Sequence, residues 1–303
     1  MIFLEYIHLV ERQLLDANLV FGHGVDNAFD EAVWLVMSAS GIDAGAETVD
    51  WQLVLNTEQK VAVQNLTKQR IKSRKPLAYI LNRAWFAGHE FFIDERAIIP
   101  RSYIGEWISD RFVPWLPDVE IKAALDLCTG SGCIAISVAL AFPEARIDAA
   151  DISYRALEVA SINVMRHALG ERVHLLRSDL FKAISGDNQY DLIVCNPPYV
   201  SDQIMASLPL EYGFEPKLAL AGGGDGLFFI SRMLAESSQY LSNDGSIFIE
   251  VGGAANAIEK MWPKVPFTWL TSLTGESVIL LLTAEELNTY SQYFNQHGRQ
   301  QLD

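Results

Sequence analysis

The most specific string for chemistry is Asn196-Pro197-Pro198-Tyr199, which directly follows the apolar run YDLIVC. Each proline fixes its φ and lacks an N–H donor, so acceptors remain: the Asn196 side-chain oxygen and the Pro197 carbonyl. Such a pair can hold both hydrogens of a planar –NH2 group while the Tyr199 ring packs on its conjugated plane. An ordinary turn is the alternative, although it would not require two successive prolines at the end of a buried strand.

This arrangement suits a nitrogen that is a poor nucleophile because its lone pair is delocalised, as in an amide or an aromatic amine. Holding both hydrogens directs the lone pair toward an incoming methyl carbon and stabilises the charge that develops on nitrogen. We therefore predict Asn196, Pro197 and Tyr199 as catalytic residues, and we expect them to bind the substrate together with Pro198. No ordinary general base is required.

A glycine-containing loop lies between the apolar runs IKAAL and CIAISVAL. Glycines there let the backbone turn tightly and approach a ligand. An acid at the front of the loop would repel a pyrophosphate but would suit a ligand that carries a cation, such as the amino group of S-adenosylmethionine. An ordinary strand–helix turn is the alternative. The candidate cofactor contacts are Asp126, Cys128, Thr129, Gly130, Ser131 and Gly132.

Two further acids end predicted strands. Asp151 ends ARIDAAD, where a carboxylate can accept from both ribose hydroxyls of a nucleoside; a helix N-cap is the alternative. Asp179 ends the next run and can accept from an adenine amino group, with Leu180 and Phe181 as apolar cover. A turn aspartate followed by two core residues is the alternative for this second position.

The elements that must position these residues alternate along the chain after Pro117. Alternation of strands and helices predicts a parallel sheet that is covered on both faces. The run WLTSLTGESVILLLTA predicts a final β-hairpin, and the polar tail 290–303 is expected to fray. The predicted strands are IKAALDL, ARIDAAD, RVHLLRSD, YDLIVCN and GSIFIEVG, and the predicted helices cover 134–141, 155–169 and 227–241.

The first 75 residues have helical patterns. Apolar residues recur at three- and four-residue steps in 2–15, and further helices are predicted over 27–40, where Gly41 and Gly45 stop the pattern, and over 57–72. The aromatic and β-branched segment 79–100, with a Gly-His break, predicts a short hairpin. We expect a small helical bundle joined to the larger part by a β connector.

Composition limits the classes of function. The net charge of −15 argues against a protein that coats duplex nucleic acid, because such affinity comes mainly from Lys and Arg. One basic island breaks the acidic chain: Lys68–Lys75 could contact ribosomal RNA weakly, with a solvated helix end as the alternative. Three cysteines fit neither a disulfide framework nor a zinc site, so we expect no metal. With no signal peptide and no apolar span, the cytoplasm is the expected location and a membrane is not an expected partner.

Together, the glycine loop, Asp151, Asp179 and Asn196–Tyr199 resemble the motifs of class I S-adenosylmethionine-dependent methyltransferases that act on amino nitrogens. The N-terminal helices and the string EPKLALAGGGDGL are similar to the protein-(glutamine-N(5)) methyltransferases. One bacterial branch of that family modifies peptide-chain release factors and the other modifies large-subunit ribosomal protein 3. The wording AWFAGHEFFIDERAIIPRSYIGEWI resembles the ribosomal branch, although Tyr103 stands where that branch often has proline.

The resemblance implies a Rossmann-like α/β fold: a mixed seven-stranded sheet, mostly parallel with a C-terminal antiparallel hairpin, and a small N-terminal helical domain. It implies a helical substrate-recognition domain (1–78), a β-hairpin connector (79–100) and a catalytic domain (101–303). It also implies that the cofactor is converted to S-adenosylhomocysteine, that the substrate is large-subunit ribosomal protein 3, and that residues 128–132, Asp151, Leu180 and Asn196 contact the cofactor.

Two uncertainties remain open in the sequence. Arg101 lies in a segment that resembles a pocket lining, so it is a candidate for binding the substrate or the cofactor carboxylate; a surface pair with Glu106 is the alternative. Alternative substrates are release factors and, less in keeping with the charge, an amine on an RNA or DNA base. Electrostatic attraction favours a basic protein substrate for so acidic a chain.

Overall fold

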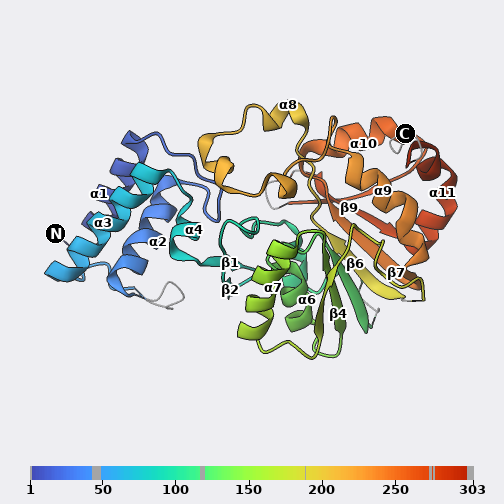
Figure 1. The fold of residues 1–303 in the computed structure, drawn as a ribbon, viewed down its shortest axis with the longest axis horizontal. Coiled ribbons are helices and arrows are strands. Elements are labelled where there is room, and N and C mark those ends of the chain that lie inside the picture. The colour runs from blue at the N-terminus through green and yellow to red at the C-terminus, as the bar shows by residue number, and fades with distance from the viewer. Residues whose placement is uncertain are drawn as a thin grey trace.

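A computed structural model describes residues 2–42, 49–116, 120–187, 189–272, 275 and 277–298. Figure 1 shows a group of helices at the N-terminal end, drawn in blue, beside a larger part in which helices cover a twisted sheet. The segment between β6 (Tyr190–Cys195) and α9 (Phe228–Glu236), drawn in yellow to gold, extends across the top of the view toward the N-terminal helices. These two parts and the segment that spans them frame the site.

The N-terminal helices follow the apolar pattern and its caps. In α1 (Phe3–Asp16) five residues of the predicted stripe are buried, namely Phe3, Tyr6, Ile7, Val10 and Leu14, whereas Leu9 and Leu15 are exposed. Helix α2 (Ala28–Ser40) begins at Asn27, whose side chain accepts from the Asp30 N–H, and ends at Gly41 in the left-handed region. Helix α3 (Thr57–Ser73) has a capping box that begins one residue before its predicted start. These three helix predictions are confirmed; Gly45 lies outside the described residues.

The segment after α3 starts as a helix and then forms the predicted hairpin. Helix α4 (Leu77–Leu81) comes first, so the predicted hairpin segment 79–100 begins with helical turns and not with a strand. Strands β1 (Ala84–Phe86) and β2 (His89–Phe91) pair antiparallel around Ala87 and Gly88, both with positive φ. The short helix α5 (Ile104–Ser109) leads into the sheet.

The sheet has the order β5-β4-β3-β6-β7-β9-β8. The strands are parallel from β5 to β7, and β9 pairs antiparallel with both β7 and β8. The predicted mixed seven-stranded sheet with a C-terminal hairpin is therefore confirmed. Its strands are β3 (Ala123–Leu127), β4 (Arg146–Asp151), β5 (Val173–Arg177), β6 (Tyr190–Cys195), β7 (Leu241–Glu250), β8 (Thr268–Thr271) and β9 (Ser277–Thr283).

Helices cover both faces of the sheet, and alternate strand residues face opposite cores. In β6, Leu192 and Val194 join the core under one face, whereas Ile193 and Cys195 join the other. Figure 1 shows α6 and α7 below the sheet and α9, α10 and α11 at the other side. The bounds are α6 (Cys133–Ala141), α7 (Tyr154–Arg166), α8 (Asp202–Met205), α9 (Phe228–Glu236), α10 (Ala255–Met261) and α11 (Ala284–Gly298).

Two expectations about the C-terminal part are wrong. The helix expected over 227–241 ends at Glu236, because a 3-10 turn (Ser237–Gln239) intervenes and Leu241 already belongs to β7. The tail does not fray at Tyr290: α11 continues to Gly298, and Phe294 is fully buried with its ring 5.9 Å from that of Trp262. Phe294, with Tyr290 and Tyr293 packed beside it against the same core, anchors a segment whose composition is otherwise polar.

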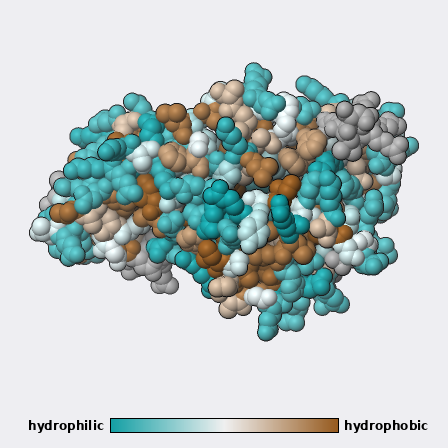
Figure 2. Space-filling view, in the orientation of Figure 1, coloured by the Kyte–Doolittle hydropathy of each residue, from teal (hydrophilic) through white to brown (hydrophobic). Residues whose placement is uncertain are grey.

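The surface is mixed. Figure 2 shows polar side chains over most of this face, with apolar ones gathered toward its middle, between the N-terminal helices and the sheet. The three cysteines are free thiols. Among the described residues, helices that combine the length and the apolar character needed to cross a bilayer are absent.

Candidate active site

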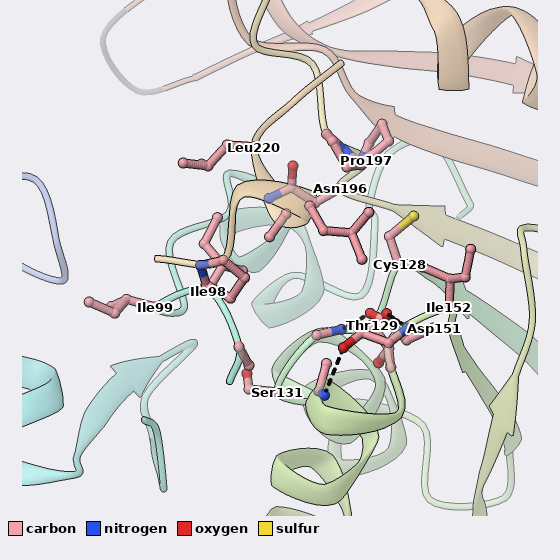
Figure 3. Close-up of a pocket in the computed structure, with 18 of the residues that line it drawn as sticks. Ile98, Ile99, Cys128, Thr129, Ser131, Asp151, Ile152, Asn196, Pro197 and Leu220 are labelled. Atoms are coloured by element: carbon pink, nitrogen blue, oxygen red, sulfur yellow. Dashed lines mark hydrogen bonds between the residues drawn. The ribbon is translucent and has the colours of Figure 1, made fainter. Parts of the chain in front are cut away.

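A cavity of about 480 Å³ opens at the carboxyl ends of β3, β4, β5 and β6. One side, here called the strand-end wall, is formed by the segments 128–134, 151–156 and 178–180; the other, the loop wall, is formed by the segments 95–102 and 208–220. All of 95–102 lines the cavity, but of 208–220 only Leu208, Tyr212, Pro216, Leu218, Ala219 and Leu220 do, and Gly132 does not. Asn196–Tyr199 lies between the two walls. Figure 3 shows Asn196 and Pro197 placed between Leu220 and Cys128, with Asp151 and Thr129 below them.

The glycine loop holds an unusual backbone. Cys128, Gly130 and Gly132 have φ of 58°, 57° and 79°, so alternate residues lie in the left-handed region. Glycine adopts this region freely, whereas Cys128 pays a strain of roughly 1–2 kcal/mol. A Cβ at Gly132 would meet the Cβ of Ala160 at 3.2 Å, so glycine also allows α7 to approach closely. The loop lines the cavity through the predicted Cys128, Thr129, Gly130 and Ser131.

Asp126 lies beneath this loop and not on the cavity wall. It is fully buried, and its Oδ2 accepts from the Thr129 hydroxyl (2.5 Å) and from the Ala135 N–H (3.0 Å). Burial raises the pKa of the Asp126 carboxyl to about 7, although the hydrogen bonds from Thr129 and Ala135 oppose the rise. The structure therefore gives Asp126 the part of a loop anchor and does not bring it to the cavity as the predicted direct ligand.

Asp151 lines the cavity at the end of β4. Its Oδ2 accepts from the Gly130 N–H (2.9 Å) and its Oδ1 from the Ser153 N–H (2.8 Å). The helix N-cap of α7 is Ser153, so the alternative of Asp151 as that cap is wrong. Burial raises the pKa of Asp151, opposed by these two backbone donors. Each oxygen of Asp151 keeps a second lone pair, so the carboxylate can still accept hydrogen bonds from the two hydroxyls of a diol in the cavity.

Asp179 and Leu180 line the same wall. Asp179 accepts from Arg232 (2.8 Å) and Lys182 (2.6 Å). Burial alone would raise its pKa, but the hydrogen bonds from these two cations make the net shift downward. Both of its oxygens are thus already engaged by cations of the same protein, which compete with a ligand for them. Leu180 adopts a φ of 49° and is buried, offering an apolar edge to the cavity.

Glycines clasp the Asn196–Tyr199 segment from outside. A Cβ at Gly222 would lie 2.7 Å from the Cα of Tyr199, and one at Gly226 would lie 2.4 Å from the Tyr199 carbonyl oxygen. A Cβ at Gly252 would meet the Tyr199 ring at 2.6 Å. Only glycine lets these three backbone segments approach so closely. The Gly222–Gly226 run therefore fixes the proline-rich segment in place.

The hydroxyl of Tyr199 donates to Glu250 Oε1 (3.0 Å) at the end of β7. Glu250 Oε2 accepts from the Ser102 hydroxyl (2.5 Å) and from the Tyr103 N–H (2.9 Å). Burial raises the pKa of Glu250 to about 7, and these three donors oppose the rise. Sequence reasoning missed Glu250; the available signal was an acid in the otherwise apolar strand SIFIEV.

Arg101 lines the cavity, and the alternative prediction that it pairs with Glu106 on the surface is wrong. Its guanidinium forms a bidentate pair with Glu215 (2.5 and 2.7 Å) and not with Glu106. The carboxylate of Glu215 is buried and also accepts from the Ile99 N–H (3.2 Å). His23 Nε2 lies 3.7 Å from it, and burial lowers the pKa of His23 to about 4. Glu215 stands in the quoted string EPKLAL but received no role from sequence.

The basic island is turned largely inward. Arg70 is fully buried against Glu31 (2.7 Å), Arg74 pairs with the buried Glu211 (2.5 Å), and Lys75 pairs with Glu95. Lys68 and Lys72 remain exposed. The island is thus neither a free RNA-binding stripe nor a simple solvated helix end, because three of its cations neutralise acids of the same protein.

The model of the Methyltransferase small domain family matches residues 109–209, which include the glycine loop and Asn196–Tyr199. A ribosomal protein uL3 glutamine methyltransferase from Francisella tularensis is 44% identical over 97% of this chain and 93% of its own length. A second, from Bordetella pertussis, is 44% identical over 94% of this chain and 96% of its own length. The chain belongs to the ribosomal protein uL3 glutamine methyltransferase family.

Membership of the uL3 glutamine methyltransferases confirms the predicted family and its ribosomal-protein branch. Among solved structures, the hMettl16 catalytic domain in complex with MAT2A 3′UTR hairpin 1 superposes with a TM-score of 0.50 at 17% identity, covering 79% of this chain and 85% of that one. This likeness shows the shared fold alone. Family membership also implies S-adenosylmethionine as the methyl donor.

The residues of the strand-end wall fit that cofactor. A carboxylate (Asp151), a glycine turn that exposes its backbone and apolar side chains such as Ile152 and Leu180 line one continuous cavity. These are the groups that a ribose diol, a polar amino-acid tail and an adenine ring require. Groups of three or more His, Cys, Asp or Glu side chains placed to hold a metal are absent from the described part of the chain.

Proposed function

We propose that this chain transfers a methyl group from S-adenosylmethionine to the side-chain amide nitrogen of a glutamine in ribosomal protein uL3. The observation that carries the proposal is the position of Asn196 and Pro197. Their acceptors border the same cavity as the glycine loop and Asp151, so a methyl donor on one wall and an amide held at the junction can meet. The names of the relatives supply the substrate.

In this proposal the chain acts by positioning. When bound, S-adenosylmethionine supplies an electrophilic methyl carbon. The Asn196 side-chain oxygen and the Pro197 carbonyl accept the two amide hydrogens, which turns the nitrogen lone pair toward that carbon. As the N–C bond forms and the sulfonium S–C bond breaks to leave S-adenosylhomocysteine, the same two acceptors would stabilise the positive charge on nitrogen. One amide proton would then pass to solvent, while Tyr199, held by Glu250, packs on the amide plane. Pro198 keeps the segment rigid.

The cofactor would contact Cys128–Gly132, Asp151, Leu180 and Asn196. Asp179 stays in the proposal as a lining residue, with its two ion pairs competing for its oxygens. Asp126 would act indirectly by holding Thr129 in place. Transfer from a sulfonium carbon to an amide needs no metal, and we propose a metal-independent reaction in the cytoplasm.

We propose residues 1–78 as the substrate-recognition domain, 79–100 as the connector and 101–303 as the catalytic domain. The charge of −15 supports a basic protein as the substrate, because opposite charges accelerate encounter. The exposed Leu218 at the mouth of the cavity offers apolar contact to a polypeptide. A weak RNA contact would be limited to Lys68 and Lys72, since their neighbours are paired.

The test uses tritiated S-adenosylmethionine with purified uL3, release factors and naked ribosomal RNA in separate reactions. We expect label in uL3, on a glutamine that mass spectrometry identifies by one added methyl group. The matched enzyme control is Asn196→Ala, which should bind cofactor and leave uL3 unlabelled. Label in a release factor alone would move the substrate to the other branch, and label in nucleic acid alone would overturn the proposal.

A further inference from the structure

Two buried acids lie four residues apart on the loop wall. Glu211 belongs to the 3-10 turn Leu210–Phe214 and Glu215 follows that turn. Both carboxylates have an exposed fraction of zero. The proposed transfer uses neither side chain. A buried carboxylate is costly unless it is paired, so each acid requires a structural explanation.

Glu211 joins the loop wall to the N-terminal helices. Its Oε1 accepts from the Val20 N–H (3.1 Å) and from Arg74 Nη2 (2.5 Å). The same guanidinium donates to the carbonyls of Ala17 (3.3 Å) and Asn18 (2.9 Å), just after α1. Arg74 therefore connects the ends of α1 and α3 to the loop wall through one planar group.

Glu215 makes the second connection: it accepts from the Ile99 N–H in the connector and pairs with Arg101. His23, from the α1–α2 loop, packs on this side as well: its ring centroid lies 4.4 Å from that of Tyr212. Tyr212 lines the cavity and sits between the two acids in sequence. The N-terminal helices thus touch the back of a segment whose front faces the cavity.

Residues 208–216 have few backbone hydrogen bonds that reach beyond the segment. Its backbone hydrogen bonds are those of local turns, such as Tyr212 N–H to Pro209 O and Ala219 N–H to Pro216 O. It joins the sheet region through Val200, whose N–H donates to the Leu220 carbonyl. Between these turns and that bridge, the position of residues 208–216 depends on long-range side-chain contacts: the bonds of Glu211 and Glu215 and the packing of Phe214 against the N-terminal core. Figure 1 shows this part of the chain reaching toward the N-terminal helices.

We infer that the N-terminal domain positions the loop wall through the Arg74–Glu211 pair, and thereby sets how the glutamine-bearing polypeptide enters the cavity. Arg74 and Glu211 are positioning residues that act through Tyr212 and the lining residues beside it. The strand-end wall is anchored independently, by Asp126 and by its own backbone. This inference deepens the proposed function and rests on it, but the anchoring can be measured without any substrate.

The test uses three variants: Arg74→Met, Glu211→Gln, and the double variant that carries both changes. Each is compared with the control variant Arg83→Met. Arg83 pairs with Glu90 at 3.1 Å on the exposed surface of the connector, so its loss is a matched control. We expect each single variant to raise KM for uL3 about tenfold, equivalent to about 1.4 kcal/mol, while the Kd for S-adenosylmethionine stays within about twofold. The double variant should be no worse than Arg74→Met, because both single variants remove the Arg74–Glu211 ion pair and Arg74→Met also removes the bonds to the Ala17 and Asn18 carbonyls.

Two additions keep the test decisive if a variant is unstable. Arg74→Lys retains the charge and should recover part of the lost affinity for uL3. Hydrogen exchange on the free full-length proteins should show faster exchange of residues 208–216 in Arg74→Met and Glu211→Gln, and wild-type exchange in Arg83→Met. Unchanged exchange there, additive effects on KM, or an equal loss of cofactor affinity would each overturn the inference. If wild-type enzyme fails to label uL3, the proposed function fails, and the exchange result still decides the anchoring.

Discussion

The two walls of the cavity are built in different ways. The contacts that hold the glycine loop of the strand-end wall join residues near in sequence: Thr129 to Asp126, three positions apart, and Gly130 to Asp151, twenty-one apart. Contacts in the loop wall join distant ones: Arg101 to Glu215 over 114 positions and Val20 to Glu211 over 191. One wall follows from how a parallel sheet ends, and the other requires three regions of the chain to meet.

This difference separates what each wall can contribute. Parallel strands bring their carboxyl ends to one edge, so a strand-end site forms whenever the sheet forms. A wall held by long-range ion pairs is more dependent on its neighbours, because loss of one buried partner leaves the other uncompensated. We expect the strand-end wall to determine the affinity for the cofactor and the loop wall to determine the affinity for the protein substrate. Asn196–Tyr199, between the walls, contributes to both.

The largest expected effect is that of Asn196→Ala at the junction of the walls. Loss of one preorganised polar partner in an active site costs about 10²–10³-fold in kcat, and we expect a fall of that size for methylation of uL3. Calorimetry should show cofactor binding within a few-fold of wild type, because the strand-end wall is intact. A kcat within a few-fold of wild type would remove the amide clamp from the proposal.

Two buried acids, Asp126 beneath the glycine loop and Glu250 behind Tyr199, make the free energy of unfolding depend on pH. Burial raises the pKa of both Asp126 and Glu250 to about 7, so the folded state binds protons more tightly than the unfolded state. The stabilising contribution of each is present at low pH and is lost as pH rises: from about 4 through about 7 for Asp126, by roughly 4 kcal/mol, and from about 4.5 through about 7 for Glu250, by roughly 3 kcal/mol. Urea unfolding between pH 5 and pH 8 measures this slope.

Asp126→Asn and Glu250→Gln should each flatten that slope, the first from the strand-end wall and the second from behind Tyr199. Asp148→Asn is the matched control, because Asp148 is also buried but lies outside the cavity, where the Tyr190 hydroxyl donates to it. A slope that stays unchanged in both variants would show that these carboxyls do not titrate in the folded protein.

Asp151→Asn tests the strand-end wall alone. A hydrogen bond to a charged group contributes about 1.5–3 kcal/mol, so we expect the Kd for S-adenosylmethionine to rise about 10- to 100-fold. At saturating cofactor, kcat and the KM for uL3 should stay near wild type. Isothermal titration and steady-state kinetics distinguish the two walls here: an increase confined to the KM for uL3 would reverse the assignment.

The smallest expected effect comes from the glycine clasp. Gly222→Ala places a Cβ against the Tyr199 backbone, and such overpacking costs about 1–2 kcal/mol of unfolding free energy. Gly224→Ala, two residues away, meets nothing within 4 Å and should unfold as wild type does. Equal stability of the two variants, measured by thermal unfolding, would contradict the close approach between the two loops.

The strand-end wall was largely predictable because its signals are local. Hydrophobic runs placed the strands, and the residue types at their ends marked Asp151, Leu180 and Asn196 as lining candidates. Asp126 shows the limit of that reasoning: the motif identifies the acid, but only the structure shows its side chain turned beneath the loop toward Thr129 and Ala135. Neighbouring strand residues face opposite sides, so position in a motif does not settle direction.

The sequence by itself determined the α/β class, the C-terminal hairpin and the residues that meet at the strand ends, because periodicity and motif spacing are properties of adjacent residues. The seven-stranded mixed sheet and the family followed from the resemblance of those motifs to known methyltransferases. Only the tertiary structure decided the partners of the distant charges. Arg101 pairs with Glu215 and not with its sequence neighbour Glu106. Arg74, which the sequence places in a basic island, pairs with the buried Glu211. Which charges pair depends on which ones are brought together away from water, and that is fixed by the packing of the helices against the loop wall.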